Sequence, residues 1–210
     1  MTRLELTAKY LNELATESPA MIEARDAAAE FGITPVTPAI GAHLASVAAS
    51  SKAKTILEVG TGTGVSGLWL LKGAPLAQLT SIDVEFDSQQ HAKAAFHKAG
   101  IAGTKTRLIT GRAGDVLPRM NPASYDIVFI DAEESAILEY VEHGLSLVRE
   151  GGSVLVTRPL LDGRVADPAQ RDDTVNDVRA LLRELANATT VLAAINPAGA
   201  GLLQITTLPS

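Results

Sequence analysis

Two apolar runs of this sequence end in residues whose types and spacing suit a nucleotide-like ligand. The first run, residues 55–64, reads TILEVGTGTG, in which Glu58 is followed by three glycines at alternate positions. A glycine turn between a strand and a helix lets the backbone approach a ligand, and the helix N-terminus offers unpaired N–H groups. The second run, LTSID, ends at Asp83, about where a carboxylate would accept hydrogen bonds from ribose hydroxyls. The pattern predicts a nucleotide-type binding site.

Both features also have explanations that involve no ligand. The glycines Gly60, Gly62 and Gly64 could form a purely structural turn, and Asp83 could cap a helix. Dinucleotide enzymes use a similar pattern, G-x-G-x-x-G, so an NAD-type oxidoreductase is a further alternative. The alternate spacing of the glycines in this chain counts against that alternative.

Short apolar runs alternate with helical segments after residue 50, which predicts a doubly wound α/β sheet with parallel strands buried on both faces. We expect strands at residues 55–59, 79–84, 106–110, 125–130, 153–157, 189–195 and 202–207. We expect helices at 65–72, 88–99, about 113–120, 134–149 and 170–187. The segment INPAGAGL leaves no room for a crossover helix between the last two strands, so these should pair antiparallel. The prediction is a seven-stranded sheet with one antiparallel strand near the C-terminus.

The first 50 residues read as helices that cover this sheet. Ser18-Pro19 and Thr37-Pro38 are N-cap and first-turn signals, and they open helices that we expect at 19–32 and 38–49. An earlier helix at 4–14 places its leucines near one face. At 210 residues the chain is expected to form a single domain, with a helical cap at 1–50 and a cofactor-binding α/β core at 51–210.

Composition excludes several classes of protein. The chain is 46% hydrophobic and 20% charged, which is ordinary for a globular α/β protein, and its net charge of −6 argues against a nucleic acid partner. It has no cysteine, so disulfides and thiolate metal sites are ruled out. No apolar segment approaches the ~20 residues that span a membrane. The N-terminal residues lack a signal-peptide profile, and we expect a cytoplasmic protein with no membrane partner.

The pattern E-x-G-x-G-x-G, followed by the strand-end acid Asp83, resembles motifs I and II of the class I S-adenosylmethionine-dependent methyltransferases. From about residue 20 onward the chain resembles the small bacterial O-methyltransferases related to caffeoyl-CoA and catechol O-methyltransferases. The segments that carry this resemblance are VTPAIGAHL, ILEVGTGTGVSGLWL, YDIVFIDAE, LVREGGSVLV and LLDGRVADP. The resemblance implies a Rossmann-like methyltransferase sheet and S-adenosyl-L-methionine as cofactor.

The resemblance also implies which residues touch the cofactor. Ser66 would donate to the cofactor's carboxylate, Asp83 would bind its ribose, and Arg112 replaces an aspartate of the adenine-binding turn. The implied cofactor-binding residues are Val36, Glu58, Gly60, Thr61, Gly62, Ser66, Asp83, Val84, Ala113 and Asp131.

The acceptor site departs from the family pattern. Family members hold a divalent cation with an aspartate after the fourth strand and an Asp-Asn pair after the fifth. Here the first position is Asp131, but the other two are Thr157 and Arg158, and Glu134 replaces the family's catalytic lysine. A guanidinium does not ligate a cation, so we predict that no metal is bound. Arg158 could pair with Asp131 and hold an anionic acceptor oxygen, or it could merely fill a lost metal site with a salt bridge.

The predicted function is therefore an S-adenosylmethionine-dependent O-methyltransferase that methylates a hydroxyl of a small-molecule acceptor without a divalent metal. Asp131 and Arg158 are its candidate catalytic residues. The alternative is a catalytically degenerate S-adenosylmethionine-binding protein, which the altered metal positions motivate. The family resemblance and the apolar N-terminal helices favour a homodimer.

Overall fold

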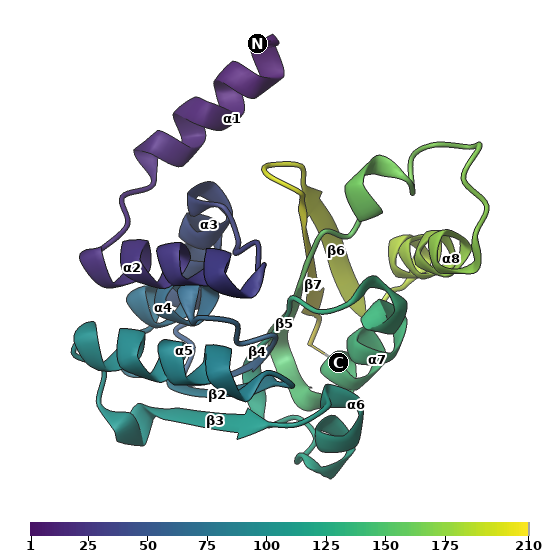
Figure 1. Cartoon of the computed structure of the whole chain (residues 1–210). Helices are drawn as coiled ribbons and strands as arrows, with labels where there is room; N and C mark the ends of the chain where they lie inside the picture. Colours follow the sequence, from purple (N-terminus) through teal and green to yellow (C-terminus); the bar gives the residue numbers. More distant parts are fainter. Residues whose placement is uncertain (210) are drawn as a thin grey trace.

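The computed structural model describes residues 1–209, and its centre is a single seven-stranded sheet (Figure 1). The strand order is β3-β2-β1-β4-β5-β7-β6. The strands are β1 (Thr55–Val59), β2 (Gln78–Asp83), β3 (Thr106–Thr110), β4 (Tyr125–Ile130), β5 (Val148–Thr157), β6 (Val191–Asn196) and β7 (Leu202–Thr207). Only β7 runs antiparallel to its neighbours, β5 and β6. The predicted fold class, including the antiparallel strand near the C-terminus, is confirmed.

Helices cover both faces of the sheet (Figure 1). One face carries α2 (Pro19–Ala28), α3 (Pro38–Ser50), α4 (Val65–Gly73) and α5 (Phe86–Lys98); the other carries α6 (Ala113–Val116), α7 (Ile137–Leu147) and α8 (Asp173–Asn187). Successive residues of a strand point to opposite faces of the sheet. Ile56 of β1 and Phe129 of β4 pack under the first helical layer, whereas their neighbours Leu57 and Val128 pack under the second. Burial on both faces explains why these strands read as continuous apolar runs.

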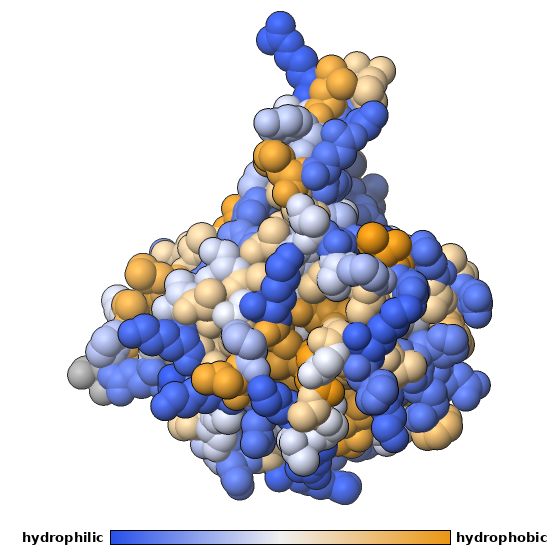
Figure 2. Space-filling model, turned by 90° about the vertical axis from the view of Figure 1, so that its left-hand side faces the viewer, coloured by the Kyte–Doolittle hydropathy of each residue, from blue (hydrophilic) through white to orange (hydrophobic). Residues whose placement is uncertain are grey.

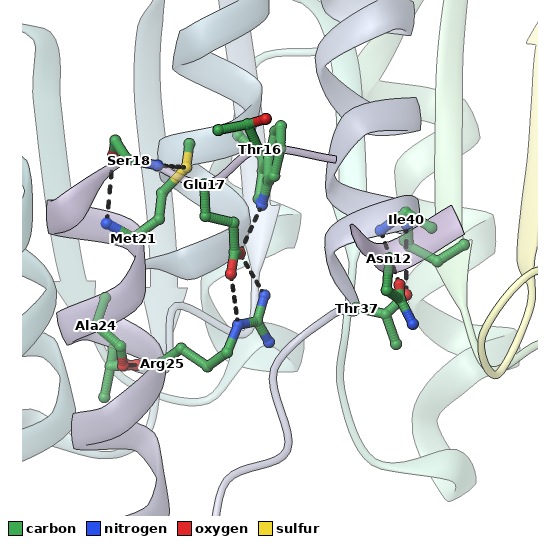
Figure 3. Close-up of polar contacts among 12 residues, drawn as sticks. Asn12, Thr16, Glu17, Ser18, Met21, Ala24, Arg25, Thr37 and Ile40 are labelled. Atoms are coloured by element: carbon green, nitrogen blue, oxygen red, sulfur yellow. Dashed lines mark hydrogen bonds and ion pairs between the residues drawn. The ribbon is translucent and has the colours of Figure 1, made fainter. Parts of the chain in front are cut away.

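The N-caps predicted for α2 and α3 are present in the structure. The hydroxyl oxygens of Ser18 and Thr37 each accept a hydrogen bond, at 3.4 Å, from the amide three residues later. Ahead of α2, the carboxylate of Glu17 accepts hydrogen bonds from the indole of Trp69 at 3.2 Å and from Nε of Arg25 at 3.0 Å (Figure 3). These contacts tie the start of α2 to α4 and hold the helical layer against the core.

The first helix, α1 (Arg3–Leu14), projects from the body of the protein (Figures 1 and 2). None of its residues is buried. Its C-terminal end is held by Asn12, whose side-chain oxygen accepts a hydrogen bond from the amide of Ala39 at 3.1 Å (Figure 3). The rest of the helix therefore has little support from its own chain.

Several element boundaries differ from those predicted. Pro118 ends α6 early, and a 3-10 turn replaces the expected rest of the helix at 117–119. The strand expected at 153–157 begins at Val148, because Tyr125 pairs with Val148 before the register shifts at Gly151 and Gly152. A 3-10 turn at 134–136 precedes α7. No helix within residues 1–209 is long and apolar enough to cross a membrane.

Two further helices are shorter than expected. The helix expected at 19–32 ends at Ala28 and continues as a 3-10 turn, which stops where Gly32 adopts the left-handed conformation. The helix expected from residue 170 begins at Asp173, because the side chain of Asp172 caps it by accepting a hydrogen bond from the amide of Val175 at 3.1 Å.

Candidate active site

Two adjoining cavities lie at the carboxyl ends of the parallel strands, where β1, β2 and β4 give way to loops. Their volumes are 530 and 330 Å³, and both are lined by Gly60, Asp83 and Asp131. The larger cavity reaches Val84 and Ala113. The smaller cavity is lined by Val36, Thr61, Gly62, Ser66 and Arg158, among others. Of the residues predicted to touch a cofactor, all except Glu58 line one of these cavities.

The glycine turn after β1 permits a close approach of two backbones. Gly60 has φ +92°, and a Cβ at this position would lie 2.0 Å from the carbonyl oxygen of Asp131. Only glycine fits there, since a side chain would be both strained and obstructed. The turn thus brings the ends of β1 and β4 together at the boundary of the two cavities.

Glu58 lies beneath the cavities, fully buried. Its two oxygens accept hydrogen bonds from Ser66 Oγ at 2.6 Å and Ser81 Oγ at 2.5 Å. Burial raises the pKa of Glu58 from 4.5 to about 7, against the opposing effect of the two hydroxyls. The Ser66 hydroxyl, which is predicted to donate to the cofactor, donates to Glu58 in this structure. Glu58 is therefore placed to position Ser66 and the turn.

Asp83 holds the turn as well as lining both cavities. Its Oδ2 accepts a hydrogen bond from the amide of Gly62 at 2.7 Å, and its Oδ1 accepts one from the amide of Glu85 at 2.9 Å. Glu85 is the N-cap residue of α5, so Asp83 orders the start of that helix. Because each carboxylate oxygen can accept two hydrogen bonds, acceptor capacity toward a ligand remains.

Arg158 reaches Asp131, the partner that the sequence analysis expected for it. Arg158 Nη2 donates to Asp131 Oδ1 at 3.0 Å, and Thr157 Oγ1 donates to the same oxygen at 2.7 Å. The side chain of Asp131 is 18% exposed and that of Arg158 is 42% exposed. Arg158 adopts φ +51°, a conformation that favours glycine or asparagine. Asp131 and Arg158 are thus fixed at the wall of the smaller cavity, with Thr157 bonded behind them.

Glu134 and Glu133 have other partners. Glu134 pairs with Arg164, whose guanidinium also lies 3.6 Å from Asp172. Glu133 accepts a weak hydrogen bond, at 3.5 Å, from the hydroxyl of Tyr140. The position of the family's catalytic lysine is therefore occupied by an acid that is bound to the loop after β5.

These residues do not fit a divalent cation. Within residues 1–209 no group of three or more His, Asp or Glu side chains has the arrangement of a metal site. Of the three positions in question, Asp131 offers oxygen ligands, Thr157 donates its hydroxyl to Asp131, and Arg158 brings a positive charge. Hard cations require several converging oxygens, which this set does not supply.

Some residues at the site were not predicted from the sequence. Tyr140 lines the larger cavity from α7, and burial, followed by the nearby Glu133 and Glu139, raises the pKa of its hydroxyl. Gln89 Nε2 donates to Thr61 Oγ1 at 3.0 Å and orders the glycine turn from α5. Both lie on helices, whereas the sequence pattern pointed mainly to residues at the ends of strands. His43 does not line either cavity and instead bonds Asn196 at 2.9 Å.

The fold and the site define a methyltransferase of the doubly wound class, in which a glycine turn after β1 and an acid at the end of β2 border the ligand cavity. The model of the O-methyltransferase family matches residues 12–207. The chain belongs to the O-methyltransferase family.

Individual relatives agree with this assignment. A Mycobacterium marinum protein, an O-methyltransferase by name, is 44% identical over 203 residues, which cover 96% of this chain and 91% of that protein. The O-methyltransferase TomG from Streptomyces achromogenes, involved in tomaymycin synthesis and solved in complex with S-adenosylmethionine, is 30% identical with a TM-score of 0.88, and the match covers 100% of each chain. A Corynebacterium glutamicum structure is 29% identical with a TM-score of 0.91, covering 100% of this chain and 99% of that one. The predicted class, an S-adenosylmethionine-dependent O-methyltransferase, is confirmed, and the degenerate binding protein is not favoured.

Proposed function

We propose that this enzyme methylates a hydroxyl of a small-molecule acceptor held beside Asp131 and Arg158, and that it does so without a divalent metal. The observation that carries the proposal is the hydrogen bond from Arg158 Nη2 to Asp131 Oδ1, at the position where the family resemblance expects a cation. The guanidinium neutralises Asp131, and Thr157 holds the same carboxylate oxygen. Asp131 Oδ2 accepts no hydrogen bond from residues 1–209, so it is available to an acceptor hydroxyl.

S-adenosylmethionine supplies an electrophilic methyl group on a sulfonium. The chain's own contribution is to bind and orient. The carboxylates of Asp83 and Asp131 suit a cationic methyl donor, the turn at Gly60 allows close backbone approach, and Ala113 and Tyr140 supply an apolar wall to the larger cavity. Alignment of two reactants within one site can supply much of the rate acceleration without a strong base.

The cofactor site is tested with S-adenosylhomocysteine and the Asp83→Ala variant. Removal of a charged acceptor is expected to cost about 1.5–3 kcal/mol, which corresponds to roughly 10- to 150-fold weaker binding in calorimetry. Asp87→Ala, which removes an exposed acid in the first turn of α5, is the matched control and should bind like the wild type. Equal affinity of Asp83→Ala and wild type would remove Asp83 from the site.

Metal independence has its own test. Neither EDTA nor Mg²⁺ should change the activity, the cofactor affinity or the Tm, because a metal that binds the native state raises the Tm with its concentration. The double variant Thr157→Asp with Arg158→Asn restores the family's oxygen ligands beside Asp131 and should gain Mn²⁺ binding, seen as a metal-dependent rise in Tm. A Mg²⁺-dependent rise in the wild type that Asp131→Ala abolishes would contradict the proposal.

The enzyme is proposed to act as a homodimer in the cytoplasm. The dimer is supported by α1, whose leucines Leu4 and Leu14 are 83% and 59% exposed on a helix with no buried residue. An isolated helix of this length is marginally stable in water, so a second copy that covers it would stabilise it. The cytoplasmic location stays a prediction from the sequence, and fractionation of the native host would test it.

A further inference from the structure

The guanidinium of Arg158 has donors to spare at the wall of the smaller cavity. Of its five N–H groups, one on Nη2 serves Asp131, and no other hydrogen bond from this side chain is made to residues 1–209. The two hydrogens on Nη2 belong to the two different edges of the planar group. Use of one therefore leaves a complete pair of parallel N–H donors on the other edge, the geometry that matches a carboxylate.

The charges around this cavity single out Arg158. Its lining residues include three acids, Asp83, Glu85 and Asp131, and a single cation, Arg158. Arg158 is therefore the one charged side chain of this lining that attracts an anion. An acceptor with a negative group would be held in one place and one orientation.

The backbone at Arg158 adopts a conformation that is unfavourable for arginine. The amide of Arg158 donates to the carbonyl of Gly201 at 3.2 Å, and its carbonyl accepts from the amide of Leu161 at 3.0 Å, which fixes the chain on both sides. Under these restraints Arg158 has φ +51°, where glycine or asparagine would be less strained. The fold thus holds the guanidinium beside Asp131 despite an unfavourable backbone conformation.

The geometry points to an acceptor that is a hydroxy acid, whose carboxylate binds the remaining N–H pair of Arg158 while its hydroxyl lies beside Asp131 Oδ2. This inference rests on the proposed function, since it names the substrate class of that site. It makes Arg158 a specificity-determining residue, and neutral phenols of the same shape should be poor acceptors.

The test uses the three hydroxybenzoates and the corresponding hydroxybenzamides as probes of equal shape and different charge. Binding to the protein loaded with S-adenosylhomocysteine is measured by calorimetry, and methyl transfer from S-adenosylmethionine is measured separately. At least one hydroxybenzoate should bind the wild type about tenfold or more tightly than its amide, in line with a charge-assisted hydrogen-bond pair. Arg158→Gln should abolish this preference, and Arg158→Lys should keep part of it.

Two controls separate this inference from other roles of Arg158. Arg171→Gln removes an exposed arginine of the same loop and should leave the preference intact. The affinity for S-adenosylhomocysteine should be the same in Arg158→Gln as in wild type. A matching loss of cofactor affinity would overturn the inference, because Arg158 would then bind the cofactor's own carboxylate.

Other outcomes distinguish a failure of the hydroxy-acid inference from a failure of the proposed function. If the wild type binds no hydroxybenzoate, or binds the amides equally well, the hydroxy-acid inference is wrong. Methylation of neutral phenols without metal would still support the proposed function in that case. Methyl transfer that occurs only with added Mg²⁺ would overturn the proposed function itself.

Discussion

Glu58 is a buried acid whose protonation couples the stability of the fold to pH. Burial raises its pKa from 4.5 to about 7 in the folded protein. Between these two values the unfolded chain releases the proton while the folded chain retains it. The stabilising contribution of Glu58 is thus complete below pH 4.5 and is lost as the pH rises toward 7.

The predicted consequence is a pH-dependent difference between the wild type and Glu58→Gln. Glutamine keeps the shape and can hydrogen-bond both serines, but it does not titrate. The free energy of unfolding of the wild type, relative to this variant, should fall by about 1.4 kcal/mol per pH unit across the window, about 3 kcal/mol in total. Urea unfolding at pH 5, 6, 7 and 8 measures this. A difference that does not change with pH would mean that Glu58 is ionised throughout.

The site residues that can be predicted from the sequence are those at the ends of parallel strands. Gly60 and Asp131 follow parallel strands and Asp83 ends one, and such strand ends must meet at one edge of the sheet, where the cavities lie. The partner of Ser66 and the cavity position of Tyr140 could not be read in this way. They depend on how helices pack against the sheet, and a linear pattern of residue types does not encode that packing.

Arginine side chains hold the loop between β5 and α8 in place. Arg158 binds Asp131 and Arg164 binds Glu134, which joins this loop twice to the loop after β4. Arg179 on α8 donates to four backbone carbonyls of the loop, from Arg164 to Gln170. The loop is therefore fixed by charge pairs and backbone hydrogen bonds in addition to the buried side chain of Leu161.

A charge swap tests this role of the loop. Glu134→Lys restores the family's lysine but places it against Arg164, so the like charges should release the loop. We expect faster amide hydrogen exchange across residues 158–172 and an unchanged core. The double variant Glu134→Lys with Arg164→Glu re-forms the pair in reverse and should recover part of the slower exchange, since the contact of Arg164 with Asp172 is not restored. Equal exchange in all three proteins would show that the pair does not hold the loop.

The order of helices and strands follows from the sequence better than their ends do. Apolar runs bounded by glycine or proline located all seven strands, and the short connection at 197–201 fixed the antiparallel pairing. The ends depend on local chemistry that competes with periodicity, as where the side chain of Asp172 caps α8 three residues later than expected. The extension of β5 to Val148 depends on Tyr125 in the neighbouring strand, a contact remote in sequence.

The N-terminal helices differ in how much of their surface the rest of the chain buries. Helices α2 and α3 contribute buried residues to the core, which supports our proposal that residues 1–210 form a single domain. Helix α1 contributes none and stands away from that core (Figure 2). Its exposed apolar side chains support our proposal that a second copy of the chain binds there.

We expect charged residues on α1 to prevent the proposed binding of a second copy. The double variant Leu4→Glu with Leu11→Glu places charges on the apolar side of α1 and should convert the dimer to a monomer in light scattering. Because neither leucine is buried in its own chain, the circular dichroism of the core should be unchanged. Lys9→Gln alters the polar side of the same helix and should remain dimeric. A wild type that is monomeric at micromolar concentration, or a double variant that stays dimeric, would exclude α1 as the interface.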